Sequence, residues 1–294
     1  MKLITPIDIT PSTWHIGYDD RILMLGSCFS DEIGAQMAQR ALQVTCNPFG
    51  TLYNPLSIAQ AINLQLPITN NQSPITNDQL VFHDGLWHSM FHHGSFSRPT
   101  REQTEQAVAD SIETMQKALS EASVVIVTFG TAWVYEMDGV VVGNCHKLPA
   151  ERFTRRRLSV EEIVAAWKPI LAQYNDKHWI FTVSPIRHIK DGLHENQLSK
   201  ATLLMAVEHL TAQRSNSATV RQAKPVYFPS YEIVLDELRD YRFYADDLVH
   251  PSSMAVQYVW ERFVDTFCTP QTRNEMQIRH KQWKQSQHRP IRPK

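Results

Sequence analysis

The sequence has no long hydrophobic segment. No stretch approaches the ~18 consecutive apolar residues of a membrane-spanning helix. The first eight residues also lack the uninterrupted apolar run of a signal peptide. We therefore expect a protein without a membrane span and with a cytoplasmic location.

Cysteine and net charge are equally scarce. The 294 residues include four cysteines at scattered positions, and no two of them have the Cys-x-x-Cys spacing: Cys28, Cys46, Cys145 and Cys268. This usage predicts reduced thiols and not a disulfide framework. The formal charge of −1 gives no general attraction to nucleic acid or anionic lipid, so we expect no nucleic-acid partner.

A metal site is not expected either. The residues between positions 83 and 146 from which a zinc site could be built are His83, His88, His92, His93, Cys145 and His146. Their spacing fits no standard ligand pattern, and two of them lie in a predicted hairpin. We predict no metal and no cofactor.

What the chain does have is an apolar content of 43% and an alternation of strand and helix patterns. Short apolar runs predict strands at residues 22–25, 43–46, 124–129, 179–183 and 225–228. Helix starts are indicated at Thr100, Ser159 and Ser252 or Ser253. The pattern predicts a three-layer α/β/α fold with a parallel sheet of about five strands.

We expect residues 1–270 to form one domain. A polar, Pro/Asn-rich stretch followed by an Asp84-Gly85 turn signal indicates an inserted hairpin region at about residues 65–97. Residues 271–294 form a basic tail, with seven Lys and Arg residues against one Glu from Arg273 onward. Such a tail can contact nucleic acid or membrane, but a solvated terminal helix is the commoner case.

The first motif of chemical interest is Gly26-Ser27-Cys28, which follows an apolar run and precedes a helix start. A side chain at such a turn is exposed at the carboxyl end of the sheet, where the helix N-terminus favours negative charge. A hydroxyl or thiol there can act as a nucleophile if a base reaches it. The alternative is an ordinary turn and helix cap.

The second motif places Asp247 three residues before His250. Alone, this short pattern often occurs by chance. Combined with the first motif on an α/β pattern, it suggests a nucleophile, a base and an acid that orients the base.

These residues resemble those of a known family. Gly26-Ser27-Cys28-Phe29-Ser30 resembles the motif that names the GSCFA-domain proteins, with Ser30 in place of the usual Ala. Four further blocks resemble that family in the same order: Asn47-Pro48-Phe49-Gly50 with Tyr53-Asn54-Pro55, Phe129-Gly130-Thr131, Ser184-Pro185-Ile186-Arg187-His188, and Asp247-Leu248-Val249-His250-Pro251. The resemblance covers roughly residues 1–270.

The GSCFA proteins are in turn similar to the SGNH (GDSL-like) hydrolases, a flavodoxin-like α/β/α group of esterases and lipases. This resemblance implies that Gly50 is an oxyanion-hole glycine, Asp247 the acid and His250 the base. It also implies that Cys28 stands at the nucleophile position. Ala132 stands where those enzymes have an Asn donor, next to Gly130 and Thr131 of the same block.

Three possibilities for the nucleophile stay open. Cys28 could react as a thiolate, because a helix N-terminus and a neighbouring imidazolium both lower the pKa of a thiol. Ser27 could instead be the exposed group, with Cys28 packed beneath the turn. Neither side chain reacts in the third possibility.

Other candidate binding residues have simpler alternatives. Asn47 could supply the missing amide donor, although before Pro48 it is more often a turn residue. Arg187 and His188 could bind an anionic acyl group or phosphate at the active edge, although a loop arginine is commonly in a surface ion pair.

We therefore expect an esterase or acyl hydrolase that acts on a short O-acyl ester, for example an acetyl ester, of a small molecule or glycan. Transfer of the acyl group to another acceptor is equally compatible with the motifs. The alternative is a catalytically degenerate protein that binds a glycan or metabolite or serves as an interaction module. The sequence leaves the oligomeric state open.

Overall fold

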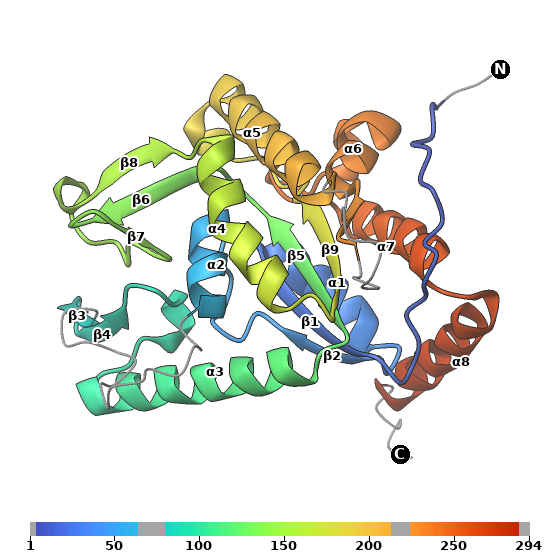
Figure 1. Ribbon diagram of the computed structural model, residues 1–294, viewed down its shortest axis with the longest axis horizontal. Helices are drawn as coiled ribbons and strands as arrows, with labels where there is room; N and C mark the ends of the chain where they lie inside the picture. The colour runs from blue at the N-terminus through green and yellow to red at the C-terminus, as the bar shows by residue number, and fades with distance from the viewer. Residues whose placement is uncertain (1–3, 64–79, 213–223, 288–294) are drawn as a thin grey trace, which may run out of the picture.

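The computed structural model describes residues 4–63, 80–212 and 224–287, and the fold centres on a five-stranded parallel sheet (Figure 1). Its strands lie in the order β10-β9-β5-β1-β2, and all four neighbouring pairs are parallel. The strands are β1 (Arg21–Gly26), β2 (Gln43–Cys46), β5 (Val124–Phe129), β9 (His178–Val183) and β10 (Val226–Phe228). The predicted α/β fold with about five parallel strands is confirmed.

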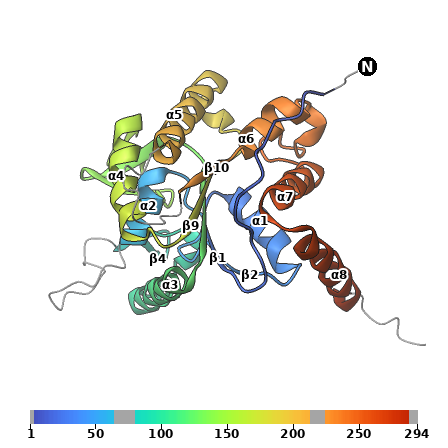
Figure 2. The same cartoon turned by 45° about the vertical axis from the view of Figure 1, so that its right-hand side comes forward.

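Helices cover both faces of this sheet (Figure 2). One face carries α2 (Pro55–Asn63), α3 (Arg101–Glu121), α4 (Val160–Gln173) and α5 (Leu193–Thr211). The other carries α1 (Cys28–Ala38), the short α6 (Ser230–Glu232) with the π-helical turn Ile233–Leu238, and α7 (Ser253–Phe267), beyond which lies α8 (Pro270–Gln287). The molecule therefore has three layers.

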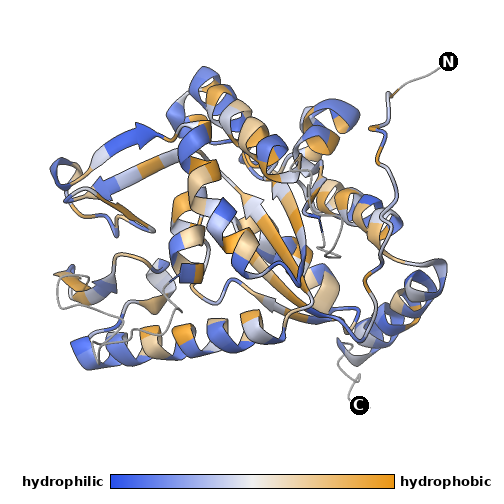
Figure 3. Cartoon of the chain, viewed as in Figure 1, coloured by the Kyte–Doolittle hydropathy of each residue, from blue (hydrophilic) through white to orange (hydrophobic). Residues whose placement is uncertain are grey.

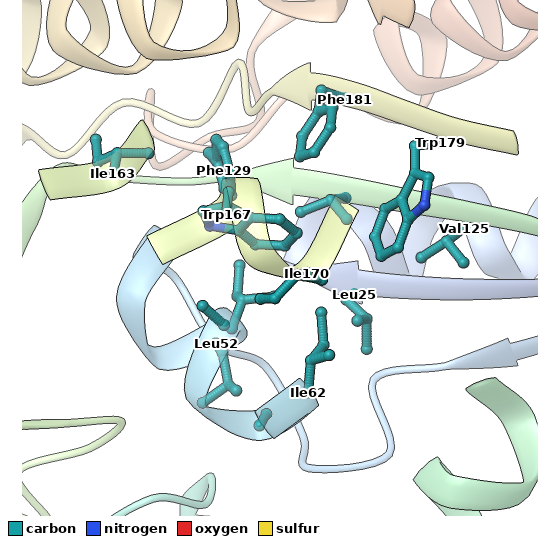
Figure 4. Close-up of a cluster of buried hydrophobic side chains, with 14 of the residues drawn as sticks. Leu25, Leu52, Ile62, Val125, Phe129, Ile163, Trp167, Ile170, Trp179 and Phe181 are labelled. Carbon is teal, nitrogen blue, oxygen red and sulfur yellow. The ribbon is translucent and has the colours of Figure 1, made fainter. Parts of the chain in front are cut away.

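The largest core lies between the sheet and the α2–α5 layer, and Figure 4 shows part of it. Trp167 of α4 packs edge-on against Phe129 of β5 and Phe181 of β9, with ring centroids 5.3 Å apart in both pairs. Both faces of the sheet are buried, so its strands are almost uniformly hydrophobic (Figure 3). This explains why continuous apolar runs identified them.

The predicted helix starts at Thr100, Ser159 and Ser252 are correct. The Thr100 hydroxyl accepts a hydrogen bond from the amide of Gln103 at 3.2 Å. Ser159 and Glu162 form a complete capping box at the start of α4. Ser252 caps α7 through the amide of Ala255. Each cap satisfies amides that would otherwise lack an intrahelical partner.

Two antiparallel additions lie at one end of the molecule (Figure 1). The hairpin β3 (Leu80–His83) and β4 (Leu86–Ser89) turns at Asp84 and Gly85, as predicted. A second sheet contains β6 (Trp133–Met137), β7 (Val140–Val142) and β8 (Thr154–Arg157). The expected polar stretch at residues 65–79 and the end of the basic tail at residues 288–294 lie outside the described residues.

Four 3₁₀ turns complete the described elements, at Gly94–Phe96, Ala150–Arg152, Ile189–Asp191 and Tyr241–Phe243. Across residues 4–63, 80–212 and 224–287, no helix combines the length and apolar character that crossing a bilayer requires.

Gly26 is predicted to be essential for the stability of the fold, because a side chain at this position would clash with the neighbouring strand. Its φ is +136°, and an added Cβ would lie 2.1 Å from the Thr128 carbonyl oxygen. Gly85 has a φ of +75° but open space around it. We expect Gly85→Ala to cost about 1–2 kcal/mol of unfolding free energy, and Gly26→Ala about 4 kcal/mol or more. Urea denaturation measures the unfolding free energy of both variants. Equal losses would contradict the prediction, because they would show that the structure relieves the clash at position 26.

Candidate functional site

The first part of the site is the turn that joins β1 to α1. Ser27 is the helix cap residue, although its hydroxyl makes no capping hydrogen bond, and Cys28 is the first residue of the helix. The Ser27 amide donates to the Thr128 carbonyl of β5 at 3.3 Å. The turn therefore lies at the carboxyl end of two central strands, where ligands bind in open α/β sheets.

Burial separates the two nucleophile candidates. Ser27 is 1% exposed, and its buried Oγ has no hydrogen-bond partner among the residues that the structure describes. A Cβ added to Gly130 would lie 3.3 Å from the Ser27 Cβ, so the serine lies directly beneath the strand end. Cys28 is partly exposed. Of the two side chains, Cys28 is the one that a ligand can reach.

The electrostatic state of Cys28 differs from the expected one. Burial raises the pKa of the Cys28 thiol, and the negative charges of Asp31 and Glu32 raise it further. The amides of Cys28 and Phe29 at the start of α1 act in the opposite direction but are outweighed. The expectation that the helix N-terminus and an imidazolium would lower this pKa therefore does not hold for the free protein.

Asn47 shapes the turn through both ends of its side-chain amide. Its Oδ1 accepts from the Gly26 amide at 2.8 Å, and its Nδ2 donates to Asp31 at 2.8 Å. The Asn47 carbonyl accepts from the Gly50 amide at 2.7 Å. The two expected oxyanion donors, the side chain of Asn47 and the amide of Gly50, are thus engaged within the protein.

Gly130 and Thr131 lie beside the same turn and are also engaged. Both amides donate to the Tyr53 carbonyl, at 2.8 and 3.0 Å. The Thr131 hydroxyl pairs with Ser199, and Ala132 is completely buried. This block positions the loop around Tyr53, and no side-chain amide occupies position 132.

Asp247 and His250 form the expected pair. The Asp247 carboxylate contacts the Nδ1 of His250 at 2.6 Å and accepts from the amides of Val249 and His250 at 2.9 and 3.0 Å. These hydrogen bonds, those from His250 foremost, lower the pKa of Asp247 to about 2. Both side chains are about half exposed. The carboxylate fixes the imidazole and leaves its Nε2 as the reactive nitrogen.

The nucleophile and the base are not hydrogen-bonded to each other. Among the described residues, the Nε2 of His250 has no hydrogen-bond partner, and neither Ser27 nor Cys28 is hydrogen-bonded to the ring. The loop that carries His250 is held instead by Arg187, whose amide donates to the Val249 carbonyl at 3.1 Å and whose guanidinium donates to the Leu248 carbonyl at 2.9 Å.

His188 lies between the two halves of the site. Its ring is edge-on to Tyr53 at 6.2 Å, and its amide donates to Asn196 at 3.0 Å. Burial, reinforced by the charges of Lys200 and His250, lowers the pKa of His188 to about 4. His188 is therefore a neutral imidazole near neutral pH, and its buried Nε2 has no partner.

Lys200 is a site residue that sequence analysis missed. It is 1% exposed, and its Nζ donates to the carbonyls of Gly130 and Ser184 at 2.6 and 2.7 Å. Burial lowers the pKa of Lys200 to about 7, and the nearby Cys28 partly offsets this effect. The feature of the sequence that could have identified it is a lysine among the buried positions of α5, three residues before Leu203.

The histidine-rich region between residues 83 and 146 has local partners. His92 pairs with Ser89 and Ser111 at 2.8 and 3.0 Å, and His146 pairs with the Ser89 carbonyl at 2.8 Å. Within the part of the chain that the structure describes, no three His, Cys, Asp or Glu side chains are placed to hold a metal ion.

Comparison with known proteins gives one result. The family model described as the GSCFA family matches residues 21–263, which include every site residue described above. No curated protein and no solved structure shows significant similarity to the chain.

The unpartnered hydroxyl of Ser27 predicts that Ser27→Ala leaves the unfolding free energy unchanged or slightly higher, because no hydrogen bond is lost. Ser199→Ala is the matched control. Ser199 is also 1% exposed, but its hydroxyl accepts from the Ala132 amide at 2.7 Å. Loss of this hydrogen bond should lower the unfolding free energy by about 1–3 kcal/mol. Urea denaturation would contradict the assignment if both variants were equally destabilised.

Proposed function

The chain belongs to the GSCFA family, and from this premise we propose that it is an acyl hydrolase or acyltransferase related to the SGNH hydrolases. Its substrate is a short O-acyl ester, for example an acetyl ester, of a small molecule or glycan. The observation that carries the proposal is the Asp247–His250 pair, in which a carboxylate holds one imidazole nitrogen at 2.6 Å and leaves the other free. This arrangement suits a general base.

In the proposed reaction, the Cys28 sulfur attacks the ester carbonyl. The Nε2 of His250 accepts the thiol proton and then donates it to the departing alcohol, so that a thioester forms as the C–O bond breaks. His250 next removes a proton from water, which hydrolyses the thioester, or from an acceptor alcohol, which takes the acyl group. As the C–S bond breaks, the imidazolium returns this proton to the departing Cys28 sulfur. Asp247 stays ionised and stabilises the imidazolium.

The developing oxyanion needs donors at the start of α1. The amides of Cys28 and Phe29 face the thiol and already favour negative charge there. The Gly50 amide could contribute only after release from the Asn47 carbonyl. Arg187 and His188 lie on the loop after β9 and are proposed to contact the substrate. His250 must also approach Cys28, and its half-exposed position on a loop allows this.

The proposal extends to the setting of the enzyme. Residues 1–270 are proposed to act as one domain with the hairpin region as an insertion, and residues 271–294 as a solvated basic segment. A cytoplasmic location would make intracellular esters the substrates. No metal or cofactor takes part in the proposed steps.

A second candidate function is a non-catalytic module that binds a glycan or metabolite in the same place. The engaged amides of Gly50, Gly130 and Thr131 favour it, as does the raised pKa of Cys28. The two candidates differ in whether Cys28 and His250 are needed for turnover.

Turnover of 4-nitrophenyl acetate tests this difference. We expect Cys28→Ala and His250→Ala each to lower kcat/KM on the order of 10³-fold or more, because they remove the nucleophile or the base. Asp247→Asn should lower it up to ~10⁴-fold through loss of the correct imidazole orientation. Ser27→Ala and Cys268→Ala are the controls and should keep wild-type activity. Full activity in Cys28→Ala would reject the thiol mechanism, and absence of turnover in the wild type would favour the binding module.

Thiol labelling tests the pairing of Cys28 with His250 independently of substrate. Iodoacetamide should modify Cys28 before the other three cysteines. Burial raises the pKa of Cys145 to about 11 and that of Cys268 to about 12, and also raises that of Cys46. His250→Ala should slow the labelling of Cys28 alone, as read by mass spectrometry of digested protein. Unchanged labelling in that variant would show that His250 does not reach the thiol.

A further inference from the structure

A cleft of about 640 Å³ is lined by the loop after β9, by α5 and by residues of the segment 231–244. Arg187 forms part of its wall, and so does Asn196, whose side chain accepts from the amide of His188. The same Arg187 holds the loop that carries His250. One residue thus both lines the cleft and holds the loop of the proposed base.

One charged side chain in the wall of the cleft has no ion-pair partner among the described residues. Arg239 lines the cleft but is paired with Asp236 at 3.0 Å, and Asp240 is paired with Arg242 at 3.2 Å. The guanidinium of Arg187 donates to the Leu248 carbonyl, and among the described residues no carboxylate forms an ion pair with it. A guanidinium without a carboxylate is suited to a ligand oxyanion.

Aromatic and apolar side chains make up much of the remaining lining, which also includes Asn196 and Gln197. The guanidinium of Arg187 lies 5.5 Å from the ring of Tyr241 and 5.3 Å from that of Tyr244. Tyr231 lies in the same cleft, and Tyr241 is 64% exposed and Leu193 56% exposed. Rings that hold a guanidinium in place leave its hydrogen-bonding edge available. Their exposed surfaces can cover an apolar body attached to the anion.

We infer that this cleft binds the part of the substrate that carries an oxyanion on an apolar or aromatic body, with Arg187 as the residue that recognises the charge. The inference rests on the proposed function in treating the bound molecule as a substrate, whereas the binding of an anion in the cleft does not depend on catalysis. If the chain is the proposed enzyme, its preferred ester is an anionic one.

Isothermal titration calorimetry with three probes tests the binding. The probes are 4-nitrobenzoate, phenyl phosphate and, as the neutral match of the first, 4-nitrobenzyl alcohol. At least one anion should bind the wild type ~10-fold or more tightly than the neutral probe, since a hydrogen bond to a charged group discriminates by this order. The two anions distinguish a carboxylate from a phosphate preference. Equal affinity for all three probes would overturn the inference.

Arg187→Gln should weaken binding of the preferred anion ~10-fold or more. The matched control is Lys190→Gln, which removes the same charge from an exposed residue of the same loop that does not line the cleft. It should stay within about twofold of the wild type. Equal losses of affinity in both variants would show that the anion responds only to the overall charge of the protein, and would reject the site.

Kinetics separate this inference from the proposed function. The wild type should cleave mono-4-nitrophenyl glutarate faster than 4-nitrophenyl pentanoate, and Arg187→Gln should remove that preference. If no ester is cleaved but the anion still binds through Arg187, the proposed function fails and the inference stands. If esters are cleaved through Cys28 without any preference for the anion and no probe binds, the inference fails alone.

Discussion

The buried ammonium of Lys200 is the interaction on which the site depends. Its Nζ donates to the carbonyls of Gly130 and Ser184, which follow the central strand β5 and its neighbour β9. A buried cation is costly unless it is well hydrogen-bonded, and burial indeed lowers the pKa of Lys200 to about 7. Two short bonds to carbonyls offset this cost and fix both strand ends. The Gly130 end supports the Tyr53 loop, and the Ser184 end leads to Arg187 and His188.

The fold could be predicted where local chemistry is explicit. A sheet covered on both faces requires continuous apolar strands, and helix N-caps favour Ser, Thr, Asp or Asn, so both leave local signals. Helix α2 was missed although Asn54 caps it and Pro55 begins it, because a Gly/Pro-rich loop precedes it. Strand β8 has no apolar signal at all. Its Thr154–Arg157 sequence pairs along β6 and is supported by ion pairs of Arg155 and Arg156, which depend on distant residues.

The site shows the same division between local and distant chemistry. Asp247 and His250 are three residues apart, so their hydrogen bond follows from a short loop and could be predicted. The burial of Ser27 depends on Gly130, more than a hundred residues later, and no local pattern encodes it. The engaged amide of Gly50 and the role of Lys200 are likewise set by tertiary contacts. Motifs therefore identify which groups can react, whereas packing decides which of them is accessible and charged.

Cys28 and Lys200 are electrostatically coupled, and burial opposes a charge on either side chain. Burial favours the neutral form of both groups, since it raises the pKa of Cys28 and lowers that of Lys200 to about 7. An ionised Cys28 nevertheless raises the pKa of Lys200, so a thiolate favours the ammonium form of the lysine. In the proposed enzyme, the thiol proton would pass to His250 when the imidazole reaches Cys28. The raised pKa of the thiol keeps a reactive thiolate from forming before the base is in place.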